Sequence, residues 1–486
     1  VRKLDELERK YFFAFYQFVA QELMLSKIGD GKYSKGHSSL WNKEDVSEND
    51  ESDSIEPLEV IENYSDDIEN QRLVLKHTNF DPNDSFNFRK GDICVLYQKK
   101  SSSQTATAGQ IYKCSVFKEI SKDGVIEVVF RYKQNTLAKD KIFNNESTWC
   151  LEHDSLDHSF TSMFKGLFQF TQTDKSRRET ILGRTKPAEY TSLNKELVKS
   201  DENANEDSRK EQNQILNEAI AAKDYYLLVG PPGTGKTSIM LKHLVREIHN
   251  TSEGNILVLA YTNRAVDEIC ESVNNAIINF DDKNDGRVNW GKTDRNFIRI
   301  GSKLSTSEEH HHNLLSVISE GCTTRAELVG VLDKHRVFVS TVSSIVNKTE
   351  LFKIKQFDTV IIDEASQILE PQLIGLLGHF KKFILIGDHK QLPAVSLQGS
   401  SLAKRAVGEL TSLGMLDLRE SYFERLLRIV KQNKWNHAHN MLSYQGRMHK
   451  RVATFPNHCF YGSKLKIAGL PHQKGDLPFV KFNSSL

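Results

Sequence analysis

An apolar run of strand length, Tyr225 to Val229, leads directly into a turn rich in glycine and proline. After the turn, Ser238 to Ile248 carries apolar side chains at helical spacing. The turn itself reads Gly230-Pro231-Pro232-Gly233-Thr234-Gly235-Lys236-Thr237. Its glycines let the backbone N–H groups curl inward, and the following helix adds the positive end of its dipole. The order of strand, loop and helix with this spacing predicts a phosphate-binding loop.

Two side chains at the end of the loop complete this prediction. We expect Lys236 to reach the β and γ phosphates of ATP, and the Thr237 hydroxyl to ligate Mg²⁺. The alternative is a glycine–proline turn that binds nothing, and the match in the correct context disfavours it. The residues expected to bind the nucleotide here are Gly230, Gly233, Thr234, Gly235, Lys236, Thr237 and Ser238.

A chain of 486 residues is too long for one compact core. At about 150 residues per domain, it should contain about three units. The net charge of +1 shows no global signature of nucleic-acid binding, so any basic track must be local. The six cysteines are scattered without a C-x-x-C pair, so we expect neither a metal cluster nor a disulfide framework.

The sequence also bears on location. No apolar run is long enough to predict a membrane span. We expect a cytoplasmic, nucleoid or nuclear protein. The first residue is Val1 rather than Met, so we expect the true N-terminus to be missing.

The pattern of periodicities divides the chain into five segments. Residues 1–71 predict an amphipathic helix followed by an acidic linker. Residues 72–155 change to strand-like patterns without intervening helices, which predicts a small antiparallel β-barrel. Residues 156–208 predict a helical stalk and linker. Residues 209–418 alternate strand and helix, as in a parallel α/β sheet covered on both faces, and 419–486 begin a second such domain.

A second buried-strand pattern, Phe357 to Ile362, ends in a pair of carboxylates. Nucleotide sites lie at the carboxyl ends of parallel strands. We expect Asp363 to be a direct or outer-sphere partner of Mg²⁺, and Glu364 to be the base that orients and activates the attacking water. After a further strand, Phe383 to Ile386, Gln391 is expected to bond the γ phosphate or that water.

Two more strand ends carry polar side chains that suit a sugar-phosphate backbone. Tyr261, Thr262 and Asn263 follow one strand, and Ser340 and Thr341 follow another. Such groups position a nucleic-acid strand without reading its bases. Helix caps or turns explain the same residues equally well.

Taken together, these segments resemble a superfamily 1 helicase. The D-E-A-S-Q and G-D-x-x-Q-L-P forms resemble the branch containing the RNA-surveillance helicase and the replication nuclease-helicase. The matching segments are Gln212 (adenine-sensing glutamine), Gly230 to Thr237 (motif I), Tyr261 to Asp267 (motif Ia), Ser340 to Ser344 (an Ic-like motif), Asp363 to Gln367 (motif II), Gly387 to Pro393 (motif III), and Ser421 to Leu426 and Tyr444 to His449 (motif IV segments).

The resemblance implies a RecA-like P-loop NTPase sheet, preceded by a small barrel with helical stalks and followed by a second RecA-like domain. It also implies that Arg447 contacts the γ phosphate from that second domain. Gly446 departs from the family, which usually has a tyrosine there. The chain reaches Leu486 without motifs V and VI. An arginine finger contributes roughly 10³ to 10⁵ in turnover, so we expect a fragment that binds ATP but hydrolyses it poorly.

The resemblance implies an ATP-dependent helicase that translocates 5′ to 3′ on single-stranded nucleic acid. The Tyr261-Thr262 form of motif Ia favours DNA over RNA. Three alternatives remain: an ATP-gated nucleic-acid switch that does not unwind, an RNA helicase, and a P-loop kinase, which length and motifs Ia and III disfavour. We expect a monomer that binds no membrane. No nuclease constellation is visible in the chain, although a nuclease domain could precede Val1.

Overall fold

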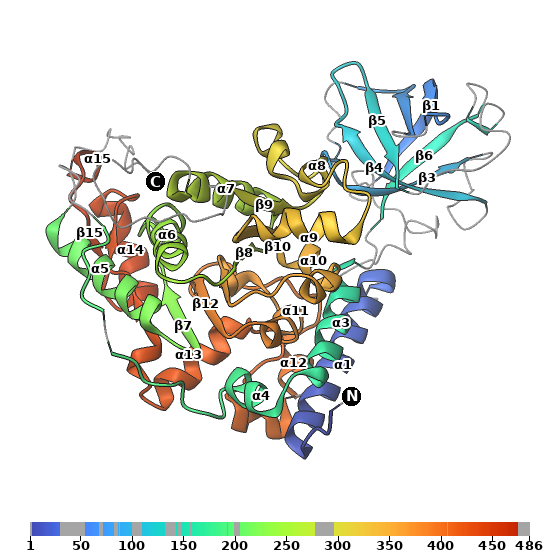
Figure 1. Ribbon diagram of the computed structural model, residues 1–486. Coiled ribbons are helices and arrows are strands. Elements are labelled where there is room, and N and C mark those ends of the chain that lie inside the picture. Colours follow the sequence, from blue (N-terminus) through green and yellow to red (C-terminus); the bar gives the residue numbers. More distant parts are fainter. Residues whose placement is uncertain are drawn as a thin grey trace, which may run out of the picture. The chain divides into compact units, whose positions relative to one another are not determined.

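The computed structural model describes residues 2–29, 54–67, 71–81, 86, 88–99, 109–131, 142–143, 147–154, 158–191, 193–198, 205–277, 296–405 and 407–474. The chain forms two compact units, one of residues 1–19 with 161–486 and the other of residues 20–160. Most of the predicted acidic linker, residues 30–53, lies outside the described residues. Figure 1 labels many of the elements of both units.

The smaller unit contains a closed, antiparallel six-stranded barrel in the order β1-β2-β5-β4-β3-β6. The barrel core is made of fully buried side chains such as Leu73, Ile126 and Trp149. Closure pairs every strand on both sides, which removes exposed sheet edges. The predicted barrel is thus confirmed. Its strands are β1 (Ser54–Tyr64), β2 (Arg72–His77), β3 (Ile93–Gln98), β4 (Ile111–Lys118), β5 (Val125–Phe130) and β6 (Trp149–His153).

The first barrel strand lies in the segment predicted as linker, so that prediction was wrong from Ser54 to Tyr64. β1 pairs with β2 on one side and β6 on the other. Leu58 and Val60 are buried while Glu59 and Glu62 are exposed. The acidic residues are therefore the outer face of a strand. A register shift between Val60 and Glu62 also breaks the alternation from which a strand is predicted.

The larger unit begins with helices that pack on one another. They are α1 (Glu6–Ile28), whose first part belongs to this unit, α3 (His158–Gln172) and α4 (Lys175–Leu182). The rings of Tyr11 in α1 and Phe170 in α3 lie 5.4 Å apart. Arg178 of α4 forms a buried ion pair with Glu8 of α1. Aromatic contacts and this pair join the three helices.

The main sheet of this unit has seven parallel strands in the order β13-β7-β12-β11-β8-β10-β9. Every residue of β7 and β8 is buried, as expected of strands covered on both faces. The predicted α/β parallel sheet is thus confirmed. The strands are β7 (Tyr225–Val229), β8 (Ile256–Ala260), β9 (Phe297–Ile300), β10 (Val337–Thr341), β11 (Thr359–Ile362), β12 (Lys382–Gly387) and β13 (His439–Met441).

Helices cover both faces of the sheet. On one face, Tyr226 and Leu228 of β7 join a core cluster with apolar residues of α5, α6 and α7. On the other, Tyr225 stacks on Phe383 of β12, which contacts Tyr422 of α13. The helices are α5 (Glu206–Ala221), α6 (Lys242–Thr251), α7 (Asn263–Ile277), α8 (Leu315–Ile318), α9 (Arg325–Asp333), α10 (Val342–Val346), α11 (Glu370–Leu373), α12 (Ser400–Arg405) and α13 (Tyr422–Gln432).

Part of the segment predicted to begin a second domain belongs to the first sheet. Residues 419–441 were assigned to the second domain, but β13 is an edge strand of the first sheet, with His439 opposite Leu227 and Met441 opposite Val229. A three-residue, half-buried strand has no apolar run that would reveal it in the sequence. A second, small parallel sheet follows, made of β14 (Tyr444–Gln445) and β15 (Lys466–Ile467). The helix α14 (Lys450–Tyr461) connects these two strands, and α15 (Pro471–Lys474) follows them.

In the ranges that the structure describes, none of the helices is both long enough and apolar enough to cross a membrane.

Candidate nucleotide-binding site

The loop after β7 has the conformation that its glycines permit. Gly233 and Gly235 have φ angles of 75° and 82°, which L side chains rarely adopt. A Cβ on Gly230 would lie 2.2 Å from Cγ of Lys236, so any other residue there would displace the Lys236 side chain. Helical structure begins at Lys236 as a π-helical segment, Lys236–Leu241, which continues into α6. The predicted strand, loop and helix are all present.

Thr237 and Asp363 are in direct contact across the site. The Thr237 Oγ1 hydroxyl donates a hydrogen bond of 2.6 Å to Oδ2 of Asp363, which follows β11. Asp363 is 2% exposed, and this burial raises the pKa of its carboxyl to about 6. A hydroxyl and a carboxylate are hard oxygen donors of the kind that Mg²⁺ prefers. A nearby cation would favour the charged carboxylate, so these two residues fit a magnesium ion.

Glu364 lies beside the lysine of the loop. Its Oε1 is 3.3 Å from Nζ of Lys236, and its side chain is about one quarter exposed. Its backbone has φ of 51°, a strained value for a residue with a side chain, and its N–H donates to Oδ1 of Asp363 at 2.9 Å. The turn that carries Glu364 is thereby held by the same carboxylate that contacts Thr237.

A cleft of about 810 Å³ opens over these residues, entirely within the larger unit. It is wide enough for a nucleotide by the usual size of ligand pockets. Predicted site residues from five parts of the sequence line it: Gln212, Gly233, Thr234, Gly235, Lys236, Thr237, Ser238, Glu364, Gln391 and Arg447. Asp363 and Gly230 contact residues that line the cleft: Asp363 accepts a hydrogen bond from Thr237, and Gly230 lies against the Lys236 side chain.

The loop of Arg447 closes the cleft from another side. The N–H of Gly446 donates to the carbonyl of Gly233 at 2.8 Å. A Cβ on Gly233 would lie 2.4 Å from Cβ of Arg447. The exposed Arg447 side chain therefore starts directly against the phosphate loop. Gly446, where the family usually has a tyrosine, is thus the residue whose backbone contacts the phosphate loop.

The residues predicted to hold nucleic acid fall into two groups. Tyr261 and Thr262 are exposed between β8 and α7, and the exposed Asn263 begins α7. Thr262 Oγ1 also accepts the N–H of Ala265. Ser340 is fully buried. Its hydroxyl donates to the carbonyl of Ile300 at 3.0 Å.

Thr341 is nearly buried and caps α10, because its Oγ1 accepts the N–H of Ser344. The cap explains Thr341, and the prediction that Ser340 presents its hydroxyl to a nucleic-acid strand was wrong. Ser340 lies within β10, which ends at Thr341, and not in a loop after the strand.

The sequence reasoning missed two residues near Gln391. Asp388 is fully buried, and its Oδ2 accepts hydrogen bonds from Gln391 Nε2 at 2.8 Å and from the Tyr461 hydroxyl at 2.6 Å. Asp388 lies in the same short motif as Gln391, which could have singled it out. Tyr461 lies in α14, far along the chain, and no sequence pattern connects it to the site.

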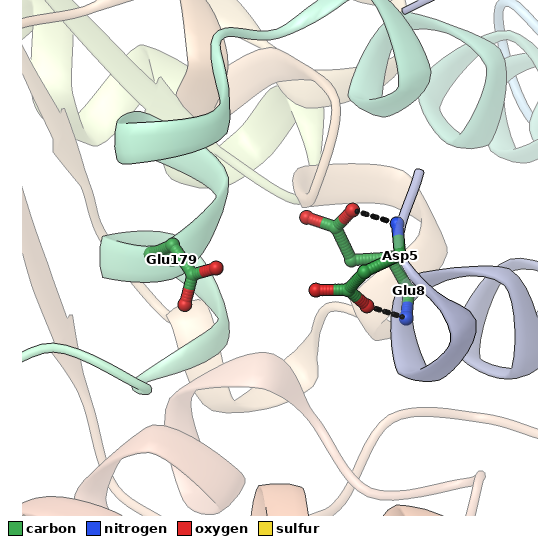
Figure 2. A group of neighbouring side chains, drawn as sticks. All are labelled: Asp5, Glu8 and Glu179. Atoms are coloured by element: carbon green, nitrogen blue, oxygen red, sulfur yellow. Dashed lines mark hydrogen bonds between the residues drawn. The ribbon is translucent and has the colours of Figure 1, made fainter. Parts of the chain in front are cut away.

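A second acidic group lies elsewhere in the larger unit. Figure 2 shows Asp5, Glu8 and Glu179, whose carboxylate oxygens lie within 4.8 Å of one another. Asp5 and Glu8 accept each other's backbone N–H groups, which caps α1. Arg184 pairs with Asp5 and Glu179, and Arg178 with Glu8. Because each of the three carboxylates is already paired with an arginine, we assign this cluster a structural role.

Known proteins match the chain over the same regions. One AAA domain family model matches residues 203–323 and 302–398, and a second AAA domain model matches residues 418–478. The chicken (Gallus gallus) DNA replication ATP-dependent helicase/nuclease is 26% identical over 97% of this chain and 43% of its own length. The human (Homo sapiens) protein of the same name is 31% identical over 53% of this chain and 21% of its own length.

An uncharacterized ATP-dependent helicase of Methanocaldococcus jannaschii is 24% identical over 64% of this chain and 52% of its own length. The chain therefore spans about half or less of each of these three relatives. Among solved structures, an arterivirus nonstructural protein 10 helicase is 10% identical, with a low TM-score of 0.35 over 82% of this chain and 58% of that one.

The matched ranges contain the phosphate loop, the Asp363–Glu364 turn, Gln391 and Arg447, which together line or support one cleft. The chain belongs to the superfamily 1 helicases, in the branch that contains the RNA-surveillance helicase and the replication nuclease-helicase.

Proposed function

We propose that this chain is the ATP-hydrolysing motor of a helicase that moves along single-stranded nucleic acid. The observation that carries the proposal is the pairing of Thr237 with Asp363 and of Lys236 with Glu364 at one end of the cleft. Lysine, hydroxyl and two carboxylates are the groups that phosphoryl transfer to water requires. A module that only binds nucleotide needs no water-orienting carboxylate.

Each residue then has a separate role. Lys236 exchanges Glu364 for the β and γ phosphates when ATP binds, which frees the Glu364 carboxylate to orient the attacking water. Thr237 and Asp363 would hold Mg²⁺, which neutralises phosphate charge. Gln391 bonds the γ phosphate or the water. Arg447 contacts the γ phosphate from the opposite wall. Gln212 contacts the adenine.

We favour DNA over RNA as the track, with 5′ to 3′ movement implied by the family. The chicken and human relatives are named DNA replication helicases, which supports DNA and a location in the nucleus or nucleoid over the cytoplasm. Tyr261, Thr262 and Asn263 are exposed at the end of β8, where they can contact a sugar-phosphate backbone. We also propose that the protein acts as a monomer.

The ATPase rate of the natural full-length protein, at fixed salt and Mg²⁺, tests the proposal. We expect single-stranded DNA to raise the rate several-fold more than single-stranded RNA of equal length does. Stronger stimulation by RNA would make the protein an RNA helicase. If neither polymer changes the rate while ATP still binds, the ATP-gated switch replaces the motor.

A further inference from the structure

The buried carboxylate of Asp388 lies at the centre of a small hydrogen-bond network. Its Oδ1 accepts the N–H of Lys390 at 3.0 Å, and its Oδ2 accepts from Gln391 Nε2 and from the Tyr461 hydroxyl. Its own N–H donates to Oγ of Ser366, two residues after Glu364. Bonds to a buried charge are stronger than those between neutral groups, so this network fixes the residues around it.

The network sets the orientation of the Gln391 amide. A carboxylate is only an acceptor, so the amide must turn its NH₂ group toward Asp388. Gln391 lines the cleft, and this orientation leaves its carbonyl Oε1 as the acceptor that it can offer to a water there. If Asp388 moved, the amide would lose the hydrogen bond that fixes its orientation.

Tyr461 brings a separate part of the chain to this network. It is the last residue of α14, is 8% exposed, and precedes Gly462, whose φ of 58° ends the helix. The loop before α14 carries Arg447, whose N–H donates to Oε1 of Gln445 at 3.0 Å. Burial raises the pKa of Tyr461, so its hydroxyl stays protonated and acts as a donor at neutral pH.

We propose that Tyr461 is a positioning residue for ATP hydrolysis, because it holds Asp388, which in turn fixes the Gln391 amide toward the cleft. The hydrogen bond from Tyr461 to Asp388 also links Gln391 to the segment that carries Arg447. The positions of Gln391 and Arg447, on two walls of the cleft, are thereby coupled. This inference rests on the proposed ATPase function.

A double-mutant cycle tests it. In the full-length protein, we expect Tyr461→Phe to lower kcat roughly tenfold, the size expected for one bond to a charged group, while KM for ATP changes less than twofold. In the Gln391→Ala background, the same substitution should cost almost nothing more, because it acts through Gln391. Tyr190→Phe is the matched control, since it removes a hydroxyl bonded to the carbonyl of His437. We expect the control to leave kcat unchanged.

The outcomes separate this inference from the proposed function. If the wild-type protein shows no ATPase, both are overturned. If the wild type is active and the Tyr461→Phe and Gln391→Ala effects multiply, Tyr461 has only a structural role and the inference alone is overturned. Loss of ATP binding by Tyr461→Phe would also overturn it, because an unchanged KM is expected.

Discussion

The two acidic groups of the larger unit differ in how their charge is balanced. In the cluster of Figure 2, Glu8 is fully buried against Arg178, and Arg184 bridges Asp5 and Glu179. At the cleft, Asp363 and Glu364 have Lys236 as their cationic partner. In the first group every carboxylate is paired with an arginine, whereas in the second Asp363 contacts the Thr237 hydroxyl and the Glu364 N–H, a setting that suits an added cation. Carboxylates near one another indicate a metal site only where the protein does not already supply their partners.

The sharpest way to test this contrast is to neutralise Glu364. We expect Glu364→Gln to lower kcat by about 10² to 10⁴, the usual contribution of a general base, with ATP binding retained. Steady-state ATPase assays with saturating single-stranded DNA measure the effect. Glu350→Gln, at an exposed position, is the control and should keep the wild-type rate. A Glu364→Gln variant with full activity would show that another residue orients the water.

The opposite behaviour is expected of the arginine-paired cluster of Asp5, Glu8 and Glu179, where a substitution should change stability and not turnover. Arg178→Met leaves the Glu8 carboxylate buried without its ion-pair partner, which should lower the free energy of unfolding by about 3–5 kcal/mol. Equilibrium urea unfolding measures this loss. The ATPase rate per folded molecule should not change. The double variant Glu8→Leu/Arg178→Met should recover much of the stability, and if it does not, the cost comes from lost packing instead.

Asp363 should make stability depend on pH in an unusual direction. Burial raises its pKa from 3.8 to about 6. The folded protein therefore binds a proton more tightly than the unfolded chain does, and this contribution to stability is present at acidic pH and is lost as pH rises from about 4 to 6. Without Mg²⁺, Asp363→Asn should raise the free energy of unfolding at pH 7.5 by up to about 3 kcal/mol relative to wild type.

At pH 4 the gain from Asp363→Asn should largely disappear, because wild-type Asp363 is then protonated. Urea unfolding of both proteins at the two pH values isolates this one group from the other titrating residues. A gain equal at both pH values would contradict the direction of the shift.

The smallest effect is expected at the solvent-exposed half of the acidic cluster. The side chains of Arg184 and Asp5 are each about one third exposed, so water and salt screen their attraction. Arg184→Gln should lower the free energy of unfolding by less than about 1 kcal/mol. Thermal unfolding at low and high salt checks this, and the difference between variant and wild type should shrink at high salt.

Helices, strands and loops that are determined by neighbouring residues could be predicted from the sequence. The strand, glycine-rich loop and helix around Lys236 depend on neighbouring residues, and all three are present. The antiparallel barrel and the parallel sheet were predicted because their strands carry β-branched and aromatic runs. By contrast, β1 and β13 were missed. Each is defined by the strands beside it, since β1 is acidic on its outer face and β13 is only three residues long.

The candidate site divides in the same way. The sequence by itself identified the residues whose chemistry suits ATP, because the phosphate loop and the carboxylates at a strand end are local patterns. The contact of Thr237 with Asp363, the burial of Ser340, and the bond from Tyr461 to Asp388 were decided only by tertiary structure. Each of these depends on segments far apart in the chain meeting at one edge of a sheet, which no local pattern specifies.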